Sequence, residues 1–250
     1  MILEIDYGNT RLKWRLLSAG SLVPVATGVA LDLQGLCVAL KNLECAAVVY
    51  CRACSVRTAE ENARLASLIK CLCGIAIDYA RSQKQLAGVT NGYLEAGRLG
   101  IDRWLAIVAA YTQVQGACVV IDCGTAITAD YIRDDGVHLG GCIAPGMGLM
   151  KAMLGNGTQL VGSIQGATIE QAVMLGDNTH AAVTFGIRSM LNGFVKEQWL
   201  SAQSVLGASF AVLCTGGDSR IVYSIIADAV VEDDLVFAGL AIACPYMARE

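Results

Sequence analysis

Two short stretches of this chain share a pattern of residues that could hold phosphate. They are Ile5-Asp6-Tyr7-Gly8-Asn9-Thr10 and, about half the chain length later, Ile121-Asp122-Cys123-Gly124-Thr125-Ala126. In each, an aspartate ends an apolar run, and the glycine two residues later lets a ligand come close to the backbone. The N–H groups of such a turn can face an anion, and the aspartate can orient a metal ion bound to phosphates. A lone copy is typical of a hairpin turn, but two copies favour a phosphate cradle built from both halves.

A second candidate is Gly100-Ile101-Asp102-Arg103-Trp104, at the start of a predicted helix. Asp102 alone could be an N-cap. Arg103 is not explained in that way, because a cation in the first helical turn opposes the helix dipole by ~0.3–1 kcal/mol unless an anion is near. An arginine at a helix N-terminus makes an anion site, and a carboxylate beside it can act as general base toward a hydroxyl. This pattern favours phosphoryl transfer.

The third candidate is Thr215-Gly216-Gly217-Asp218-Ser219, which joins an apolar strand to a helix. It is either an ordinary turn with an Asp or Ser cap, or a flat glycine surface against which a purine could lie. The residues leave both interpretations open.

The elements that would position these residues follow one order twice. The first half has predicted strands at 1–6, 11–17, 22–28, 44–50 and 74–79 and predicted helices at 58–71 and 103–114. The second half has predicted strands at 117–122, 127–132, 137–143 and 209–214 and predicted helices at 146–154, 179–200, 219–230 and 236–248. This repetition predicts an internally duplicated α/β protein. We expect two lobes, residues 1–116 and 117–250, with a boundary near Gly116 and the paired turns lining a cleft between them.

Composition excludes several classes of protein. The net charge is −4 and the 18 basic residues are scattered, which disfavours nucleic acid as the main partner. The apolar share of 55% and mean hydropathy of +0.53 are high. The apolar run at 235–247 is nevertheless shorter than the ~20 residues of a membrane-spanning helix. The acidic N-terminus does not resemble a signal peptide, so we expect a cytoplasmic globular protein without membrane contact.

The eleven cysteines are expected to be reduced core residues, because their number is odd and no secretion signal is present. Cys51-x-x-Cys54 with Cys71-x-Cys73 is the alternative, a zinc site. It is disfavoured because the second pair lacks ribbon spacing and lies in a predicted helix, where residues two apart point about 200° apart. The two histidines, His138 and His180, are far apart in the sequence and offer little for a His-based site.

Taken together and in order, these segments closely resemble the type III pantothenate kinases. The resemblance runs through nearly the whole chain and is carried by Asp6-Tyr7-Gly8-Asn9-Thr10 with Lys13, Gly100-Ile101-Asp102-Arg103, Asp122-Cys123-Gly124-Thr125-Ala126 with Thr128, Gly140-Gly141 with Ile143 and Pro145-Gly146, Asn178-Thr179, and Gly216-Gly217-Asp218. It implies the duplicated actin/hexokinase-like (ribonuclease H-like) fold. It also implies ATP-dependent phosphorylation of pantothenate to 4'-phosphopantothenate, the first step toward coenzyme A.

The resemblance also implies a role for each matching residue. Asp102 would accept the proton. The residues implied to bind ATP are Asp6, Tyr7, Gly8, Asn9, Thr10, Arg11, Leu12, Lys13, Gly124, Thr125, Gly216 and Gly217. Those implied to bind pantothenate are Tyr93, Gly100, Ile101, Asp102, Arg103 and Thr179, with Thr168 and Thr184 as alternatives to Thr179. Asp122 would bind a monovalent cation, potassium or ammonium, and Asp6 would hold magnesium.

Members of this family are typically homodimers with the substrate pocket near the interface, so a homodimer is expected. The glycine-rich residues 154–166 could be a flap or a dimer contact. Two other functions remain open: a sugar kinase of the same fold, and an ATP-binding accessory regulator without turnover. The region from Tyr93 to Arg103 is poor in the Asn, Asp and Glu side chains of a sugar pocket, and the four key residues Asp6, Asp102, Arg103 and Asp122 are intact. Both observations favour the pantothenate kinase.

Overall fold

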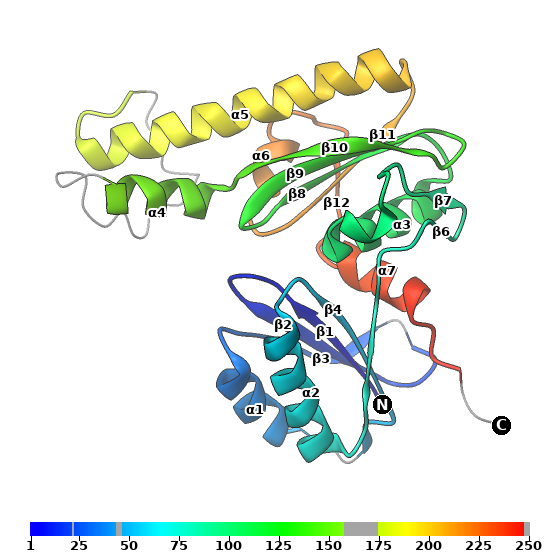
Figure 1. Ribbon diagram of the computed structural model, residues 1–250. Coiled ribbons are helices and arrows are strands. Elements are labelled where there is room, and N and C mark those ends of the chain that lie inside the picture. The colour runs from blue at the N-terminus through cyan, green and yellow to red at the C-terminus, as the bar shows by residue number, and fades with distance from the viewer. Residues whose placement is uncertain (22, 44–46, 158–174, 248–250) are drawn as a thin grey trace. The chain divides into compact units, whose positions relative to one another are not determined.

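The structure is a computed structural model that describes residues 1–21, 23–43, 47–157 and 175–247 (Figure 1). It divides into two compact units, Met1–Thr112 with Asp234–Glu250, and Gln113–Asp233. The division after Thr112 lies close to the expected boundary at Gly116. The C-terminal residues differ from the expectation, because the chain from Asp234 onward packs with the first unit and not with the second.

The first unit is built on a five-stranded sheet with the order β3-β2-β1-β4-β5. Strands β1, β2 and β3 form an antiparallel meander, and β4 and β5 run parallel to β1. The strands are β1 (Ile2–Tyr7), β2 (Leu12–Leu17), β3 (Pro24–Ala30), β4 (Tyr50–Ser55) and β5 (Ile77–Tyr79), with a separate hairpin of β6 (Gln85–Leu86) and β7 (Val89–Thr90). The helices are α1 (Leu33–Lys41), α2 (Ala59–Cys73), α3 (Ile101–Val114) and α7 (Leu235–Ala243), with a 3-10 turn at Ala96–Arg98.

Alternation along β1 separates the two faces of this sheet. Leu3, Ile5 and Tyr7 point into a core formed with α1 and α2. Helix α2 is well defined by its ends: Thr58 and Glu61 form a capping box, and Gly74 ends the helix in the left-handed conformation. The even-numbered residues of β1 therefore lie on the opposite face, where α7 packs (Figure 1).

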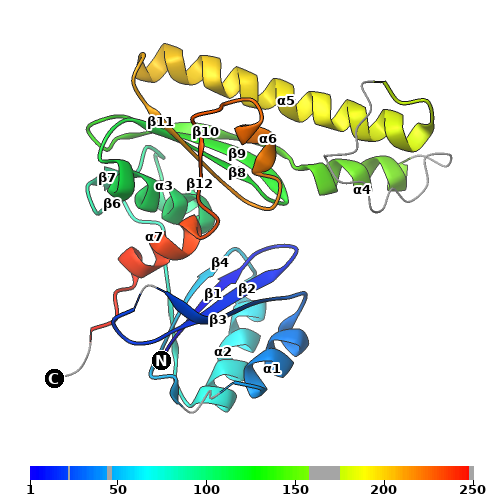
Figure 2. The ribbon, with the colours of Figure 1, turned by 180° about the vertical axis from the view of Figure 1, so that it is seen from behind.

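The second unit repeats this plan. Its sheet has the order β10-β9-β8-β11-β12, again with an antiparallel meander and two parallel strands on the far side of the first strand (Figure 2). The strands are β8 (Cys118–Cys123), β9 (Ala126–Ile132), β10 (His138–Pro145), β11 (Ala211–Thr215) and β12 (Val230–Val231). The helices are α4 (Met147–Gly157), α5 (Thr179–Leu206) and α6 (Arg220–Tyr223), and α5 and α6 share one core with the sheet. The identical strand order confirms the predicted duplication.

Most predicted elements are confirmed to within a few residues, but some are wrong. In the part of residues 44–50 that the structure describes, the chain is not a strand until Tyr50, where β4 begins. Strand β4 contains Arg52, whose buried charge is neutralised by Glu4. Because of this charged residue, the hydropathy of the sequence does not predict β4 as a buried strand. The predicted helix 219–230 shrinks to α6, because the chain then turns to pair β12 with β11. Helix α1 was not predicted.

Among the helices of the described ranges, none is both long enough and apolar enough to cross a bilayer.

Candidate active site

The first acidic turn lies at the end of β1. Asp6 is the last residue but one of this strand and is paired with Lys13 of β2 on one side and Cys54 of β4 on the other. Asp6 and Lys13 are both half-buried, so a ligand at this edge could reach the two side chains. Cys54 is completely buried.

The turn itself presents backbone and polar side chains to solvent. Gly8 is close to the carbonyl oxygen of Arg11, which a Cβ on Gly8 would approach to 3.2 Å. Asn9 and Thr10 are exposed. Arg57 donates from Nη1 to the carbonyl oxygen of Asn9 at 2.8 Å, so the turn is attached to the loop after β4. This arrangement leaves an open, donor-rich turn in front of Asp6.

Two residues of this stretch are less accessible than the resemblance implies. Tyr7 and Leu12 are 7% and 0% exposed, and both belong to the core of the first unit. Their side chains are therefore packing residues, and only their backbone atoms could contact a nucleotide. Arg11 is exposed at the start of β2.

Helix α3 carries the second candidate. It begins at Ile101, so Asp102 lies in the first turn and is not the N-cap residue considered from the sequence. The Asp102 carboxylate accepts a hydrogen bond from the Arg103 backbone N–H at 2.8 Å. Gly100 makes this position of the carboxylate possible, because a Cβ there would come within 2.8 Å of Asp102 Oδ1.

The Arg103 side chain is held by the loop that precedes α3. Its guanidinium donates from Nη1 to the Tyr93 hydroxyl at 3.0 Å, and it is 5.8 Å from the centre of the Tyr93 ring. Arg103 is only 7% exposed. The completely buried Asn91 fixes this loop, since its Oδ1 accepts from the Tyr93 N–H at 2.9 Å. The structure thus brings Tyr93, Gly100, Asp102 and Arg103 together, as predicted.

Cys54 connects the two acidic residues. Burial raises the pKa of the Cys54 thiol well above its usual value, and the negative charges of Asp6 and Asp102 raise it further. The neutral thiol donates a hydrogen bond to the Asp6 carboxylate. The charges of Asp6, from the first turn, and of Asp102, from the helix, therefore both act on the same buried thiol.

The second acidic turn occupies the equivalent place in the second unit. Asp122 is the last residue but one of β8 and is paired with Thr128 of β9 and Thr215 of β11. Gly124 and Thr125 form the short connection to β9. The Asp122 carboxylate is close to Gly124, where a Cβ would lie 3.2 Å from Oδ1.

Two further glycines approach this turn from other elements. Gly216, after β11, has a φ of +92°, and a Cβ there would lie 2.5 Å from the Cys123 carbonyl carbon and 2.6 Å from Asp122 Oδ1. Gly146, after β10, donates its N–H to the Thr125 carbonyl oxygen at 3.0 Å. A side chain at either glycine would fill the space beside the turn. The glycines predicted from the sequence are therefore required by close backbone packing.

The Gly-Gly segment is anchored to the same turn. The Asp218 N–H donates to the Cys123 carbonyl oxygen at 3.1 Å, and Gly217 is exposed. Burial raises the pKa of the Cys123 thiol, and the charges of Asp122 and Asp218 add to this effect. Asp122, Gly124, Thr125 and the start of α6 thus form one cluster within the second unit.

Thr179 lies elsewhere in the second unit. It is the first residue of α5 and is exposed, and the preceding Asn178 caps the helix by accepting from the Ala181 N–H at 3.0 Å. Of the two alternatives, Thr184 is 4% exposed and Thr168 lies outside the described residues. An exposed threonine is the better candidate for contact with a substrate. Most of the glycine-rich stretch 154–166 also lies outside the described residues.

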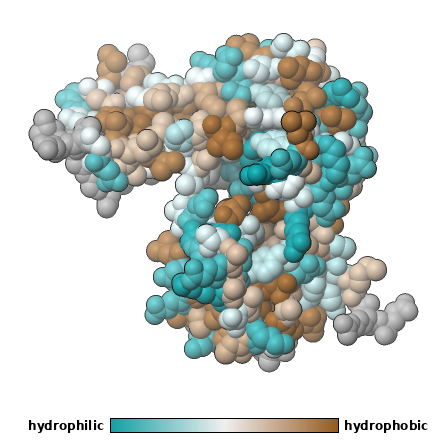
Figure 3. Space-filling view, viewed as in Figure 1, coloured by the Kyte–Doolittle hydropathy of each residue, from teal (hydrophilic) through white to brown (hydrophobic). Residues whose placement is uncertain are grey.

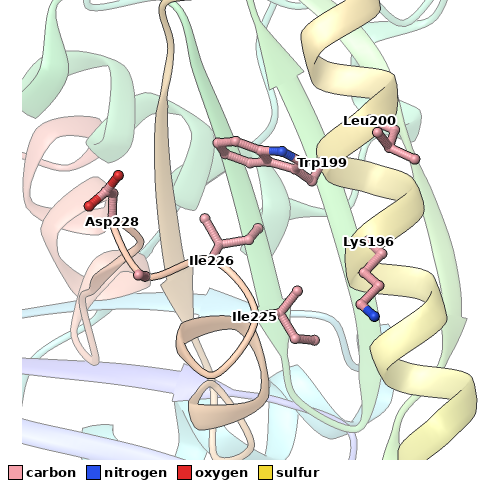
Figure 4. Close-up of a pocket in the computed structure, with 7 residues that line it drawn as sticks. Lys196, Trp199, Leu200, Ile225, Ile226 and Asp228 are labelled. Atoms are coloured by element: carbon pink, nitrogen blue, oxygen red, sulfur yellow. The ribbon is translucent and has the colours of Figure 1, made fainter.

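A pocket of about 410 Å³ in the second unit does not coincide with the predicted site (Figure 4). It lies between α5 and the turn after α6 and is lined by Lys196, Trp199, Leu200, Ile225, Ile226, Ala227 and Asp228. No predicted site residue is among these. This pocket contains neither of the two acidic turns.

The cysteines form no candidate metal centre in the described ranges, and no group of three or more Cys, His, Asp or Glu residues there could hold a metal ion. Cys51 and Cys54 are buried in β4, whereas Cys71 is exposed. His138 is buried, and its Nε2 lies 2.9 Å from Asp130 Oδ1 on the neighbouring strand of the second sheet.

Comparison with known proteins identifies the family. The model of the family described as type III pantothenate kinase matches residues 2–201. A type III pantothenate kinase from Pseudomonas aeruginosa (strain LESB58) is 43% identical over 247 residues, which cover 98% of this chain and 99% of that protein. The chain belongs to the type III pantothenate kinase family. The resemblance stated from the sequence is thereby confirmed.

Two solved structures share the fold of this family member. A Baf family protein from Campylobacter jejuni has a TM-score of 0.58 at 20% identity, covering 95% of this chain and 94% of that chain. A protein proposed to be a 2-dehydro-3-deoxygalactonokinase, from Sinorhizobium meliloti, has a TM-score of 0.58 at 13% identity, covering 98% of this chain and 100% of that chain. At these identities the likeness concerns the fold alone, and it confirms the predicted actin/hexokinase-like class.

Sequence reasoning missed two residues that contact the first acidic turn of the candidate site. Cys54 was considered only as a core or zinc-ligand cysteine, although its place on β4 sets it beside Asp6. Arg57 was not considered, although it contacts the turn at Asn9. The register of β1 against β4 places Cys54, and Arg57 lies in the loop that follows β4. This long-range pairing leaves no local pattern in the sequence.

Proposed function

We propose that this chain transfers the γ-phosphoryl group of ATP to the primary hydroxyl of pantothenate, giving 4'-phosphopantothenate and ADP. One observation supports this most: in a member of the type III pantothenate kinase family, Asp6 is paired with the buried Cys54 across β1 and β4, and the charge of Asp102 acts on the same thiol. A phosphate-binding turn and a general base are the two parts that phosphoryl transfer to an alcohol needs close together.

Asp102 is the proton acceptor in this proposal. Its carboxylate is half-buried in the first turn of α3 and oriented by the Arg103 N–H. As the substrate oxygen forms its bond to the γ-phosphorus, the hydroxyl proton passes to Asp102 and the bond to the ADP oxygen breaks. Arg103, held by Tyr93, is placed to contact pantothenate and to balance the charge that develops on the transferred group.

The first turn is the proposed site of ATP phosphates and magnesium. Gly8, Asn9 and Thr10 offer backbone and side-chain donors, and Lys13 offers a cation. Asp6 fits magnesium because it supplies a hard carboxylate oxygen at a half-buried strand end. A single protein carboxylate is sufficient where water and phosphate oxygens complete the shell, and magnesium when bound would neutralise phosphate charge.

The second turn is the proposed site of a monovalent cation and of further ATP contacts. Asp122 provides a carboxylate, and the backbone packed around Gly124, Gly146 and Gly216 provides carbonyl oxygens, which are the ligand types that hard cations prefer. Thr125 and Gly217 would contact ATP. This donor set fits potassium or ammonium.

We further propose a homodimer located in the cytoplasm. Helix α4 and the first half of α5 expose large apolar side chains, among them Met153 at 60% and Met190 at 66% (Figure 3). Exposed apolar surface of this kind is typical of subunit interfaces. Sedimentation of the purified chain would give twice the monomer mass, and a monomer at micromolar concentration would contradict this part of the proposal.

The experiment that tests the reaction measures ADP release with a panel of acceptors. Purified protein is incubated with ATP, magnesium and potassium, and with pantothenate, a set of hexoses or buffer alone. We expect ADP release above the buffer rate with pantothenate only. Release with a hexose and not with pantothenate would replace the proposal by a sugar kinase. ATP binding without release for any acceptor would replace it by a regulatory role.

A further inference from the structure

A buried ionic network lies on the same face of the first sheet as Asp6. Its central residue, Glu4, is two residues before Asp6 on β1. Glu4 of β1 is level with Arg15 of β2 and with Arg52 of β4. The three residues are 0%, 6% and 5% exposed. Glu4 accepts from the Nε atoms of both arginines, at 2.8 Å for Arg52. Two buried cations thus share one buried carboxylate.

The arginines of this network bind both ends of α7. Arg15 Nη1 is 2.9 Å from Oδ2 of Asp234, the residue before the helix, and its guanidinium lies 4.6 Å from the centre of the Phe237 ring. Arg52 Nη1 donates at 2.7 Å to the carbonyl oxygen of Cys244, the residue after the helix. The carbonyl groups at a helix end lack partners within the helix and attract cations, so Arg52 satisfies this end of α7. Glu4 therefore fixes α7 on the sheet through two intermediaries.

Helix α7 is in turn packed directly against α3. Gly239 lies in the middle of α7, and a Cβ on it would come within 2.0 Å of the Leu105 carbonyl oxygen of α3. An added methyl group would therefore force the two helix backbones apart by more than an ångström. Leu105 lies three residues after Asp102, which is one turn of the same helix. A displacement at Leu105 therefore reaches Asp102.

We propose that the Glu4–Arg15–Arg52 network and Gly239 are positioning elements that hold Asp102 beside Asp6. The network fixes α7 on the strand that carries Asp6, and Gly239 allows α3 to rest on α7 without a side chain between them. This inference rests on the proposed role of Asp102. A stabilising role alone does not explain the network, because a buried ion pair is weak evidence for stability and apolar residues could fill the same volume.

The first test replaces Gly239 by alanine. Gly239→Ala is expected to lower kcat by roughly 10- to 100-fold, because a shift of about 1 Å in a catalytic group can cost that much, while KM for ATP stays within about twofold. Gly193→Ala is the matched control: Gly193 lies in α5, and a Cβ on it would meet nothing within 4 Å. This control is expected to retain wild-type kcat.

The second test removes the charge of the network and keeps its shape. Glu4→Gln is expected to lower kcat in the same way, with KM for ATP unchanged. Asp130→Asn is the control for the stability effect, because Asp130 is a buried carboxylate 2.9 Å from His138 in the second unit. Glu4→Gln and Asp130→Asn are both expected to lower the thermal midpoint, but only Glu4→Gln is expected to lower kcat of the folded enzyme.

A readout without turnover separates this inference from the proposed reaction. Cys54 is completely buried, is paired with Asp6 across β1 and β4, and is acted on by the charge of Asp102, so displacement of α3 should expose it. Peptide mapping after brief thiol labelling, below the midpoint of each variant, is expected to show Cys54 labelled roughly threefold faster or more in Gly239→Ala and Glu4→Gln than in wild type. Unchanged labelling together with unchanged kcat would overturn the inference. An inactive wild type would instead overturn the proposed reaction, and the labelling result would still test the positioning.

Discussion

The two acidic turns occupy the same place in two sheets of the same strand order, yet their surroundings differ. Asp6 is paired with the buried Cys54, on whose thiol the charge of Asp102 in the first turn of α3 also acts. Asp122 also has a second carboxylate acting on its neighbouring thiol, that of Asp218, but Asp218 precedes the four-residue α6, and the turn is closely approached by Gly124 and Gly216. Duplication thus provided one backbone plan with two local chemistries.

The difference indicates a division of labour. A carboxylate with a second carboxylate nearby in the first turn of a long helix is suited to a site where a proton and a metal ion must be handled together. A carboxylate enclosed by close-packed backbone is suited to holding a cation in a fixed shell of carbonyl oxygens. We therefore assign catalysis to the first turn and cation and nucleotide positioning to the second.

The largest expected effect on turnover comes from replacing Asp102, the helix carboxylate near the first turn. Asp102→Asn keeps the size of the side chain and removes the proton acceptor, so kcat is expected to fall by roughly 10²- to 10⁴-fold. The dissociation constant for ATP, measured by calorimetry, is expected to stay within about twofold of wild type. Equal losses of turnover and ATP affinity would contradict the assignment of Asp102 as base.

Asp6→Asn is expected to have the next largest effect. Loss of the carboxylate weakens the hold on magnesium, so the magnesium concentration needed for half-maximal rate should rise by roughly tenfold or more. Titration of the rate with magnesium at saturating ATP measures this shift. A magnesium requirement equal to that of wild type would remove Asp6 from the metal site.

Asp122→Asn tests the second turn by the same kind of change. The ratio of rates in potassium and sodium buffers is expected to fall toward one, because the carboxylate that holds the monovalent cation is lost. The magnesium requirement should be unaffected, in contrast to Asp6→Asn. If Asp122→Asn and Asp6→Asn changed the same requirement, the division of labour between the turns would be wrong.

The smallest expected effect is on stability and compares Gly8 of the first turn with Gly216, which follows β11 and packs against the second turn. Gly216→Ala places a Cβ 2.5 Å from backbone at a φ of +92°, whereas Gly8→Ala meets a carbonyl oxygen at 3.2 Å. We expect Gly216→Ala to cost about 1–3 kcal/mol and to lower the thermal midpoint. Gly8→Ala should lower it less. Equal midpoints for the two variants would show that the second turn is not the more tightly packed.

Much of this arrangement could be predicted from the sequence, because the signals are local. The Asp-x-Gly turns and the repeated meander each lie within a short segment and are found where expected, and helix α3 begins two residues before its predicted start at Arg103. Long-range pairing was not predictable in this way. Strand β4 was predicted at 44–50 and not at its actual position, because the charged Arg52 makes this buried strand look polar in the sequence. The position of Cys54 beside Asp6 depends on the register of β4 with β1.

The C-terminal helix shows the same limit. The apolar sequence of α7 predicts a buried helix, but not the unit in which it is buried. Its place in the first unit depends on Arg15 and Arg52, which lie about two hundred residues earlier in the chain. Such a long-range contact cannot be predicted until the pairing of the strands in the first sheet is known.

The most direct test of the account is the mass of the product formed from pantothenate. Wild-type protein and Asp102→Asn are incubated with ATP, magnesium and pantothenate in potassium buffer, and the mixtures are examined by mass spectrometry. The account predicts that wild type gives pantothenate heavier by one phosphoryl group, and that Asp102→Asn gives almost none although it still binds ATP. Unmodified pantothenate in the wild-type reaction, with ATP bound, would contradict the account.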